Sequence, residues 1–182
     1  MDYISKYSFW LEDNYFDKKT KEELKLLKNN DDEIKDRFFK ELEFGTAGVR
    51  AVMGAGTNRI NIYTVRKLTQ GFANFLNEKY DKVKKEICIA YDCRNNSKEF
   101  AVQTALVLNA NGIKTYIFED FKQTPLLAYA IRFLNCIGGV VITASHNTYE
   151  YNGYKVYGDD GAQISYPDDK NLSDHINNLK SI

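Results

Sequence analysis

The sequence predicts an α/β domain of three layers, with helices on both faces of a mixed, mainly parallel sheet, preceded by an amino-terminal helical arm. Beyond residue 80, strand-like and helix-like segments alternate, which is typical of parallel strands joined by right-handed crossovers. Before residue 41, hydrophobic residues recur at helical spacing among many charged ones. A chain of 182 residues has room for one ordinary core. We therefore expect an arm over 1–40 and a domain over 41–182.

The first 80 residues predict helices on either side of a glycine-rich loop. The arm should form two or three short amphipathic helices, because hydrophobic residues such as Trp10, Leu24 and Phe38 are spaced among Lys, Glu and Asp. The stretch 44–59, FGTAGVRAVMGAGTNR, carries four glycines and supports neither a helix nor a strand. A hydrophobic stripe at helical spacing then predicts one long helix over about 62–80.

The remaining segments give the order of the sheet. EICIAY (86–91), KTYIF (114–118) and CIGGVVIT (136–143) read as three strands. Ser97 should cap the first intervening helix, which ends before Gly112, and Thr124 should cap the second, with Pro125 at its first position. GYKVY (153–157) should add a neighbouring or antiparallel strand. The tail should be helical from about Pro167, and its end without a C-cap signal suggests truncation.

Composition excludes several classes of protein. Lys plus Arg equals Asp plus Glu, at 25 each, so no nucleic acid or anionic membrane is expected as a partner. No run approaches the roughly 18 apolar residues of a membrane span, and the acidic start does not resemble a secretory signal, so we expect a cytoplasmic protein. Three cysteines without CxxC spacing and two histidines argue against a disulfide scaffold and a zinc site.

Chemistry is expected where the parallel strands end. Ligands of open α/β sheets bind beyond the carboxyl ends of the strands, and that edge collects Asp92, Arg94, Ser145, His146 and Asn147. A serine in such a place can simply close its own turn. As an acyl-transfer nucleophile it should stand in GxSxG, which TASHN (143–147) does not match.

A serine that carries a phosphoryl group needs cations and hydrogen-bond donors around it. Lys155, His146, Arg50 and the loop amides could supply them, although Lys155 and Arg50 taken alone read as solvated surface residues. GAGTNR (54–59) completes neither GxGxxG nor GxxxxGK[ST], so we interpret it as a turn that carries a functional arginine, Arg59. GDDG (158–161) reads as a tight turn and not a metal site.

Four stretches together point to a family. ITASHNTYEYNGYK (142–155) closely resembles the active-serine signature of the α-D-phosphohexomutases, the phosphoglucomutase and phosphomannomutase superfamily. FGTAGVR, YDCRNNS and QTP resemble, in the same order, the amino-terminal active-site loop, the loop after the first strand of the first domain and its threonine-proline turn. YNGYKVYGDDGAQI and GAGTNRINIYTVRK resemble the branch of bacterial phosphoglucomutases and phosphopentomutases. Thr148 departs from the family, which usually has proline there.

The resemblance implies a phosphoserine mutase. Phosphorylated Ser145 would exchange its phosphoryl group with a hexose 1- or 6-phosphate through a bound 1,6-bisphosphate. It implies catalytic roles for Ser145, His146, Lys155 and Arg50, and substrate or phosphate binding for Asn147, Thr143, Arg94 and Arg59. It also implies Mg²⁺ on the phosphate of Ser145, held otherwise by aspartates of a second domain, and glucose 1,6-bisphosphate as activator.

Family members have four domains, and the chain resembles only the first. DGDGDR, GEESG-type and terminal phosphate-binding loops are missing, so we expect a fragment with little or no mutase activity that needs the remaining domains of the same polypeptide. The preferred sugar phosphate stays open: phosphomannomutase and phosphopentomutase are alternatives to phosphoglucomutase. A non-catalytic sugar-phosphate-binding module is the rival class, and a serine hydrolase a weaker one.

Overall fold

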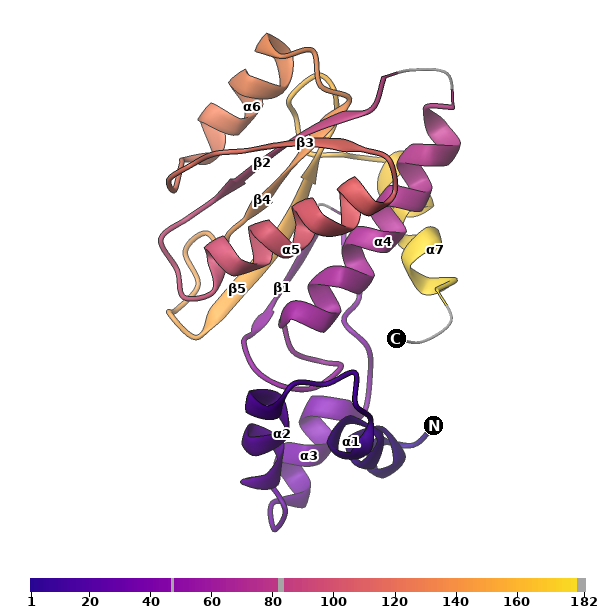
Figure 1. Ribbon diagram of the computed structural model, residues 1–182, viewed down its shortest axis with the longest axis vertical. Coiled ribbons are helices and arrows are strands. Elements are labelled where there is room, and N and C mark those ends of the chain that lie inside the picture. Colours follow the sequence, from indigo (N-terminus) through magenta and orange to yellow (C-terminus); the bar gives the residue numbers. More distant parts are fainter. Residues whose placement is uncertain (47, 82–83, 180–182) are drawn as a thin grey trace.

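The computed structural model describes residues 1–46, 48–81 and 84–179 (Figure 1). Its amino-terminal arm consists of α1 (Tyr3–Glu12), α2 (Lys18–Lys25) and α3 (Asp31–Phe38), as the sequence predicts. Each helix is capped at its amino end by a polar side chain that accepts the backbone N–H of the residue three positions later. The capping residues are Asp2, Asp17 and Asn30. The arm has its own hydrophobic cluster, which Tyr63 joins from the neighbouring domain.

The five strands form one mixed sheet in the order β1-β5-β4-β2-β3. They are β1 (Gly48–Val52), β2 (Glu86–Tyr91), β3 (Lys114–Ile117), β4 (Gly138–Ile142) and β5 (Tyr151–Tyr157). β2 pairs in parallel with β3 and β4, whereas β5 lies antiparallel between β4 and β1. β5 is thus the one reversed strand of this sheet, which confirms a mixed, mainly parallel arrangement. β1 was not predicted, since it lies in the glycine-rich stretch.

Four helices follow the arm: α4 (Ile62–Lys79), α5 (Ser97–Ala110), α6 (Thr124–Phe133) and α7 (Asp168–Asn177). Both predicted caps are wrong by one residue. The N-cap of α5 is Asn96, at φ 63°. Ser97 is the first helical residue, and its hydroxyl donates to Asp92 (2.7 Å) and does not cap the helix. Gln123, in extended conformation, precedes α6, so Pro125 occupies the second helical position, where its missing N–H is also not needed by the helix.

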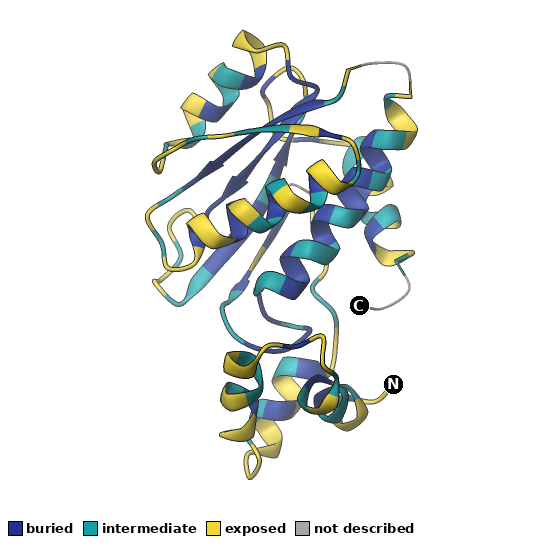
Figure 2. Ribbon diagram, in the orientation of Figure 1, coloured by how far each residue is buried: buried dark blue, intermediate teal, exposed yellow. Residues whose placement is uncertain are grey.

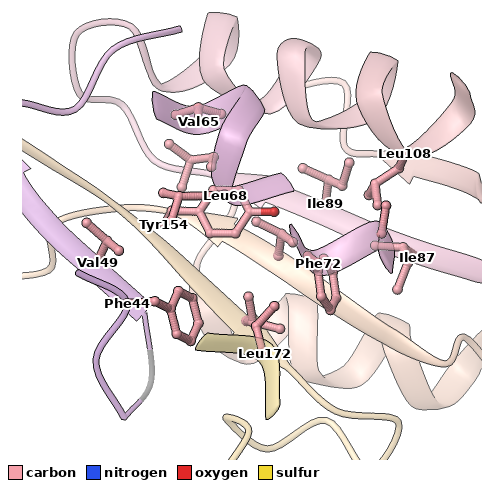
Figure 3. Close-up of a cluster of buried hydrophobic side chains, with 14 of the residues drawn as sticks. Phe44, Val49, Val65, Leu68, Phe72, Ile87, Ile89, Leu108, Tyr154 and Leu172 are labelled. Carbon is pink, nitrogen blue, oxygen red and sulfur yellow. The ribbon is translucent and has the colours of Figure 1, made fainter. Parts of the chain in front are cut away.

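Helices cover both faces of the sheet, so the predicted three-layer architecture is confirmed. The largest core lies between the sheet and α4, α5 and α7, with side chains such as Leu68, Phe72, Ile89 and Tyr154 (Figure 3). A smaller core beneath α6 holds the alternate residues of β2 and β4. Both central strands are therefore buried on both faces (Figure 2). None of the described helices is both long and apolar enough to span a bilayer.

The face of the sheet that carries α6 is covered unevenly. α6 packs on β2 and β4, at one side of the sheet. Over β1 and β5 the same face carries an exposed arginine, Arg50, and a half-buried lysine, Lys155. This open half of the sheet therefore presents two cations next to the loop that follows β4.

Candidate active site

Ser145 stands in a strained loop at the carboxyl end of β4. We call residues 143–150 the serine loop. Its first residue, Thr143, is buried, and the Thr143 hydroxyl accepts the backbone N–H of Ser145 at 2.9 Å. Ser145 itself has a φ of 58°, in the left-handed region that costs a non-glycine residue free energy. The loop thus fixes a backbone conformation that leaves the Ser145 side chain exposed.

Arg94, from the loop after β2, holds the serine loop in place. Its guanidinium donates to four backbone carbonyls: those of Ser145 (2.9 Å), Asn147 (2.7 Å), Thr148 (2.8 Å) and Tyr151 (3.1 Å). The Nε atom lies 3.2 Å from a carboxylate oxygen of Asp92, and only 15 % of the side chain is exposed. Arg94 thus positions the serine loop, and its predicted role in phosphate binding stays a prediction.

A buried polar network joins Arg94's loop to β5. One oxygen of Asp92 accepts the Arg94 backbone N–H at 3.0 Å and the Ser97 hydroxyl at 2.7 Å. Asn152, fully buried in β5, donates its amide to Ser97 Oγ at 2.9 Å and to the Asn95 carbonyl at 3.0 Å. Every buried polar group of this network has a hydrogen-bond partner, and the network fixes the loop after β2 against β5. Asn152 was not predicted, although an asparagine inside a strand of large apolar residues is an anomalous position.

Arg50 and Lys155 share one face of the sheet because of the pairing of β1 with β5. Arg50 stands opposite Gly153 and Lys155 opposite Gly48, so all four positions lie on the same side. A Cβ atom at Gly153 would lie 2.6 Å from the carbonyl oxygen of Thr143, so the serine loop approaches β5 too closely for any other residue. Arg50 then reaches the serine loop, and its Nη1 lies 3.1 Å from Oδ1 of Asn147.

Two adjacent hollows meet at this Arg50–Asn147 contact. One, of about 480 Å³, is lined by Ser145 and Asn147 together with the loop after β2. The other, of about 310 Å³, is lined by Arg50, Lys155 and Gln163. The structure thus brings the predicted serine, amide, arginine and lysine together around one open surface.

The electrostatics of the second hollow favour proton transfer. Burial lowers the pKa of Lys155 below its ordinary value, and the nearby positive charge of Arg50 lowers it further. His146 is exposed next to Ser145, with its Nδ1 atom 3.5 Å from Ser145 Oγ. His146 thus lies directly beside Ser145, whereas Lys155, whose pKa is lowered, lines the adjacent hollow with Arg50.

A protein-family model matches most of the chain. The model of phosphoglucomutase/phosphomannomutase α/β/α domain I matches residues 41–182. The chain belongs to this family. The match begins directly after the helical arm and includes every residue of the two hollows.

Relatives and solved structures agree. A phosphoglucomutase of Staphylococcus haemolyticus is 46% identical over 142 residues, which are 78% of this chain and 26% of the relative. A human phosphopentomutase is 40% identical over 158 residues, 83% of this chain and 26% of the relative. A Thermus thermophilus protein assigned as a phosphomannomutase has a TM-score of 0.69 at 27% identity, covering 75% of this chain and 30% of that one. The chain spans about a quarter of the length of the curated relatives it matches.

Arg59 lies apart from this domain I site. The residue is buried, and its Nη2 atom contacts Asp36 and Glu33 of α3, in the arm (2.5 and 3.3 Å). Arg37, also from α3, donates to the Ala55 carbonyl at 3.2 Å and forms a close ion pair with Glu23. GAGTNR is therefore the turn on which the arm docks. Its arginine satisfies arm carboxylates, and its contacts give no support to the predicted role in phosphate binding.

Across the described residues, no group of three or more His, Cys, Asp or Glu side chains is arranged to hold a metal ion. GDDG forms the predicted turn, in which Asp160 accepts the Ala162 N–H at 2.8 Å and Gly161 donates to Gly158 at 3.1 Å.

Proposed function

We propose that the chain is the active-serine domain of a phosphoglucomutase-type enzyme that interconverts hexose 1-phosphate and hexose 6-phosphate. Ser145 carries the phosphoryl group, and a hexose 1,6-bisphosphate is the intermediate. The observation that carries the proposal is the exposed, left-handed Ser145 beside the hollow of Arg50 and Lys155. Family membership and the names of the relatives support it.

The residues divide the chemistry between them. Transfer breaks the bond between phosphorus and Ser145 Oγ and forms one from phosphorus to a sugar hydroxyl, whose proton must leave. Lys155 takes that proton, since it lines the hollow with Arg50, and burial and the charge of Arg50 both disfavour its protonated form. Arg50 and the loop amides stabilise the charge on the phosphoryl oxygens, and Asn147 orients Arg50. His146 delivers a proton to Ser145 Oγ as it departs.

Magnesium would add charge neutralisation on the transferring phosphoryl group. Ser145 would contribute its phosphate oxygen, and further domains of the same polypeptide would supply the carboxylates. Glucose 1,6-bisphosphate would restore the phosphate on Ser145 whenever it is lost. The 182-residue chain by itself should therefore show little or no mutase activity.

Phosphorus NMR of the full-length polypeptide that contains this chain tests the proposal. Glucose 1-phosphate, Mg²⁺ and a trace of glucose 1,6-bisphosphate should give glucose 6-phosphate, whereas a Ser145→Ala variant should give none. Binding of the sugar phosphate without conversion would favour a non-catalytic binding module. Conversion of ribose 1-phosphate in preference to glucose 1-phosphate would favour a phosphopentomutase, in keeping with the names of several relatives.

A further inference from the structure

Two buried thiols touch beneath α6, away from the proposed active site. Cys88 lies in β2, and Cys136 lies between α6 and β4. Their Sγ atoms are 3.5 Å apart, although 48 residues separate them in the sequence. The side chains are 1% and 2% exposed, and both belong to the core between α6 and the sheet. Neither the cysteine count nor the cysteine spacing predicted this contact.

We propose that Cys88 and Cys136 form a redox pair that closes to an intrachain disulfide when the protein meets a small disulfide oxidant such as oxidised glutathione. A disulfide needs its sulfur atoms about 2 Å apart. The two sulfur atoms, at 3.5 Å, must therefore approach each other by about 1.5 Å for the bond to form. The proposal concerns a different site from Ser145 and does not depend on the proposed function.

Access to the pair runs through Cys136. That residue lines a surface hollow of about 590 Å³ with Arg132, Asn135 and Asp159, whereas Cys88 lies deeper in the core. Cys136 is therefore the thiol that reacts first. The hollow carries charges of both signs, the guanidinium of Arg132 and the carboxylates of Asp159 and Asp160, so its charge does not select the oxidant.

The exchange proceeds in two balanced steps. The Cys136 thiolate attacks one sulfur of the oxidant, the oxidant's S–S bond breaks, and one glutathione thiolate leaves. The Cys88 thiolate then attacks Sγ of Cys136 and expels the second glutathione. The protein loses two electrons to the oxidant, and the two thiol protons pass to the two released thiolates or to solvent.

Burial of the two thiols should make this reaction slow. It raises the pKa of both thiols, that of Cys88 to about 12, so the reactive thiolates are minor species at neutral pH. Closure should therefore take hours and not seconds. Cys93 provides an internal comparison, because it is exposed and stands in the loop after β2. It should react with the same oxidant much sooner but form only a mixed disulfide.

The test is thiol counting by mass spectrometry on the 182-residue chain. Reduced protein is incubated with excess oxidised glutathione at about pH 8.5, quenched in acid and then alkylated in denaturant, so that buried free thiols are also labelled. We expect the Cys88 and Cys136 peptides to become joined and their two alkylation sites to be lost. Reduction with dithiothreitol should restore all three cysteines.

Matched variants separate the pair from ordinary core packing. Cys93→Ser should leave the crosslink intact, whereas Cys88→Ala should leave Cys136 either free or as a mixed disulfide. Circular dichroism confirms that each variant is folded before oxidation. Both thiols remaining alkylatable in the folded Cys93→Ser protein, or crosslinking only after denaturation, would overturn the proposal and leave the two residues as small hydrophobic core side chains.

Discussion

Replacement of Arg94 by methionine should loosen the serine loop and destabilise the domain. The substitution keeps an apolar stem but removes four hydrogen bonds to carbonyls and the contact with Asp92. Three of the carbonyls lie in the serine loop and the fourth, that of Tyr151, lies at the start of β5, and each bond contributes about 0.5–1 kcal/mol. The free energy of unfolding should fall by about 2–4 kcal/mol. At about 2–4 °C per kcal/mol, the Tm should fall by about 5–15 °C.

Calorimetry of the purified chain measures this change, and hydrogen exchange locates it. The amides of the serine loop should exchange faster in Arg94→Met, whereas those of α5 should change only with global stability. Arg132→Met is the matched control, since Arg132 makes one 3.3 Å bond to a carbonyl of its own exposed helix and should cost under about 0.5 kcal/mol. Arg94→Lys should recover less than half of the loss, because an ammonium cannot reach four carbonyls at once. An Arg94→Met protein as stable as the control would refute the positioning role.

Three other substitutions test the surrounding structure. Gly153→Ala should cost more than about 3 kcal/mol in urea unfolding, because its Cβ would lie 2.6 Å from the Thr143 carbonyl oxygen; a cost below about 1 kcal/mol would show that the strand yields. Lys155→Met should stabilise the protein at neutral pH. The pKa of Lys155 is lower in the folded protein than in the unfolded chain, so the charged lysine destabilises the fold at neutral pH. The gain in stability should vanish as the pH rises toward the ordinary lysine pKa of 10.5. Thermal scans across that range check it, and a constant difference would contradict the pKa assignment. Arg37→Met should cost about 2–3 kcal/mol, because it removes the ion pair with Glu23 and the hydrogen bond to the Ala55 carbonyl at the GAGTNR turn; an unchanged Tm would show that the arm docks through hydrophobic contacts alone.

The main helices and strands could be predicted from the sequence because the spacing of their hydrophobic residues is unambiguous. The strand over 86–91 and the long helix over 62–80 match β2 and α4 within a residue. β1 could not be predicted, since its five residues, GVRAV, lie in a stretch broken by four glycines and give too short an alternation to tell a strand from a loop. Gly48, at φ 139°, belongs to β1 only because its missing side chain lets the backbone approach the Tyr154 carbonyl. That strand depends on its partner β5 more than on its own residues.

The residues of the candidate site could be predicted from the sequence, but their contacts could not. Arg94 and Arg59 both stand beside glycine- or asparagine-rich turns, where an arginine suits phosphate. Only the folded contacts show that Arg94 serves backbone carbonyls and Arg59 serves arm carboxylates. The proximity of Arg50 to Lys155 follows from the β1–β5 register, which hydrophobic pattern alone does not reveal.

The central claim is that Ser145 accepts a phosphoryl group. The most direct measurement is a mass spectrum of the Ser145 peptide after the full-length polypeptide has met glucose 1,6-bisphosphate and Mg²⁺. We expect an addition of about 80 Da on Ser145, which is absent from Ser145→Ala. An unmodified Ser145 in protein that binds the bisphosphate, or phosphate on another residue, would contradict the account.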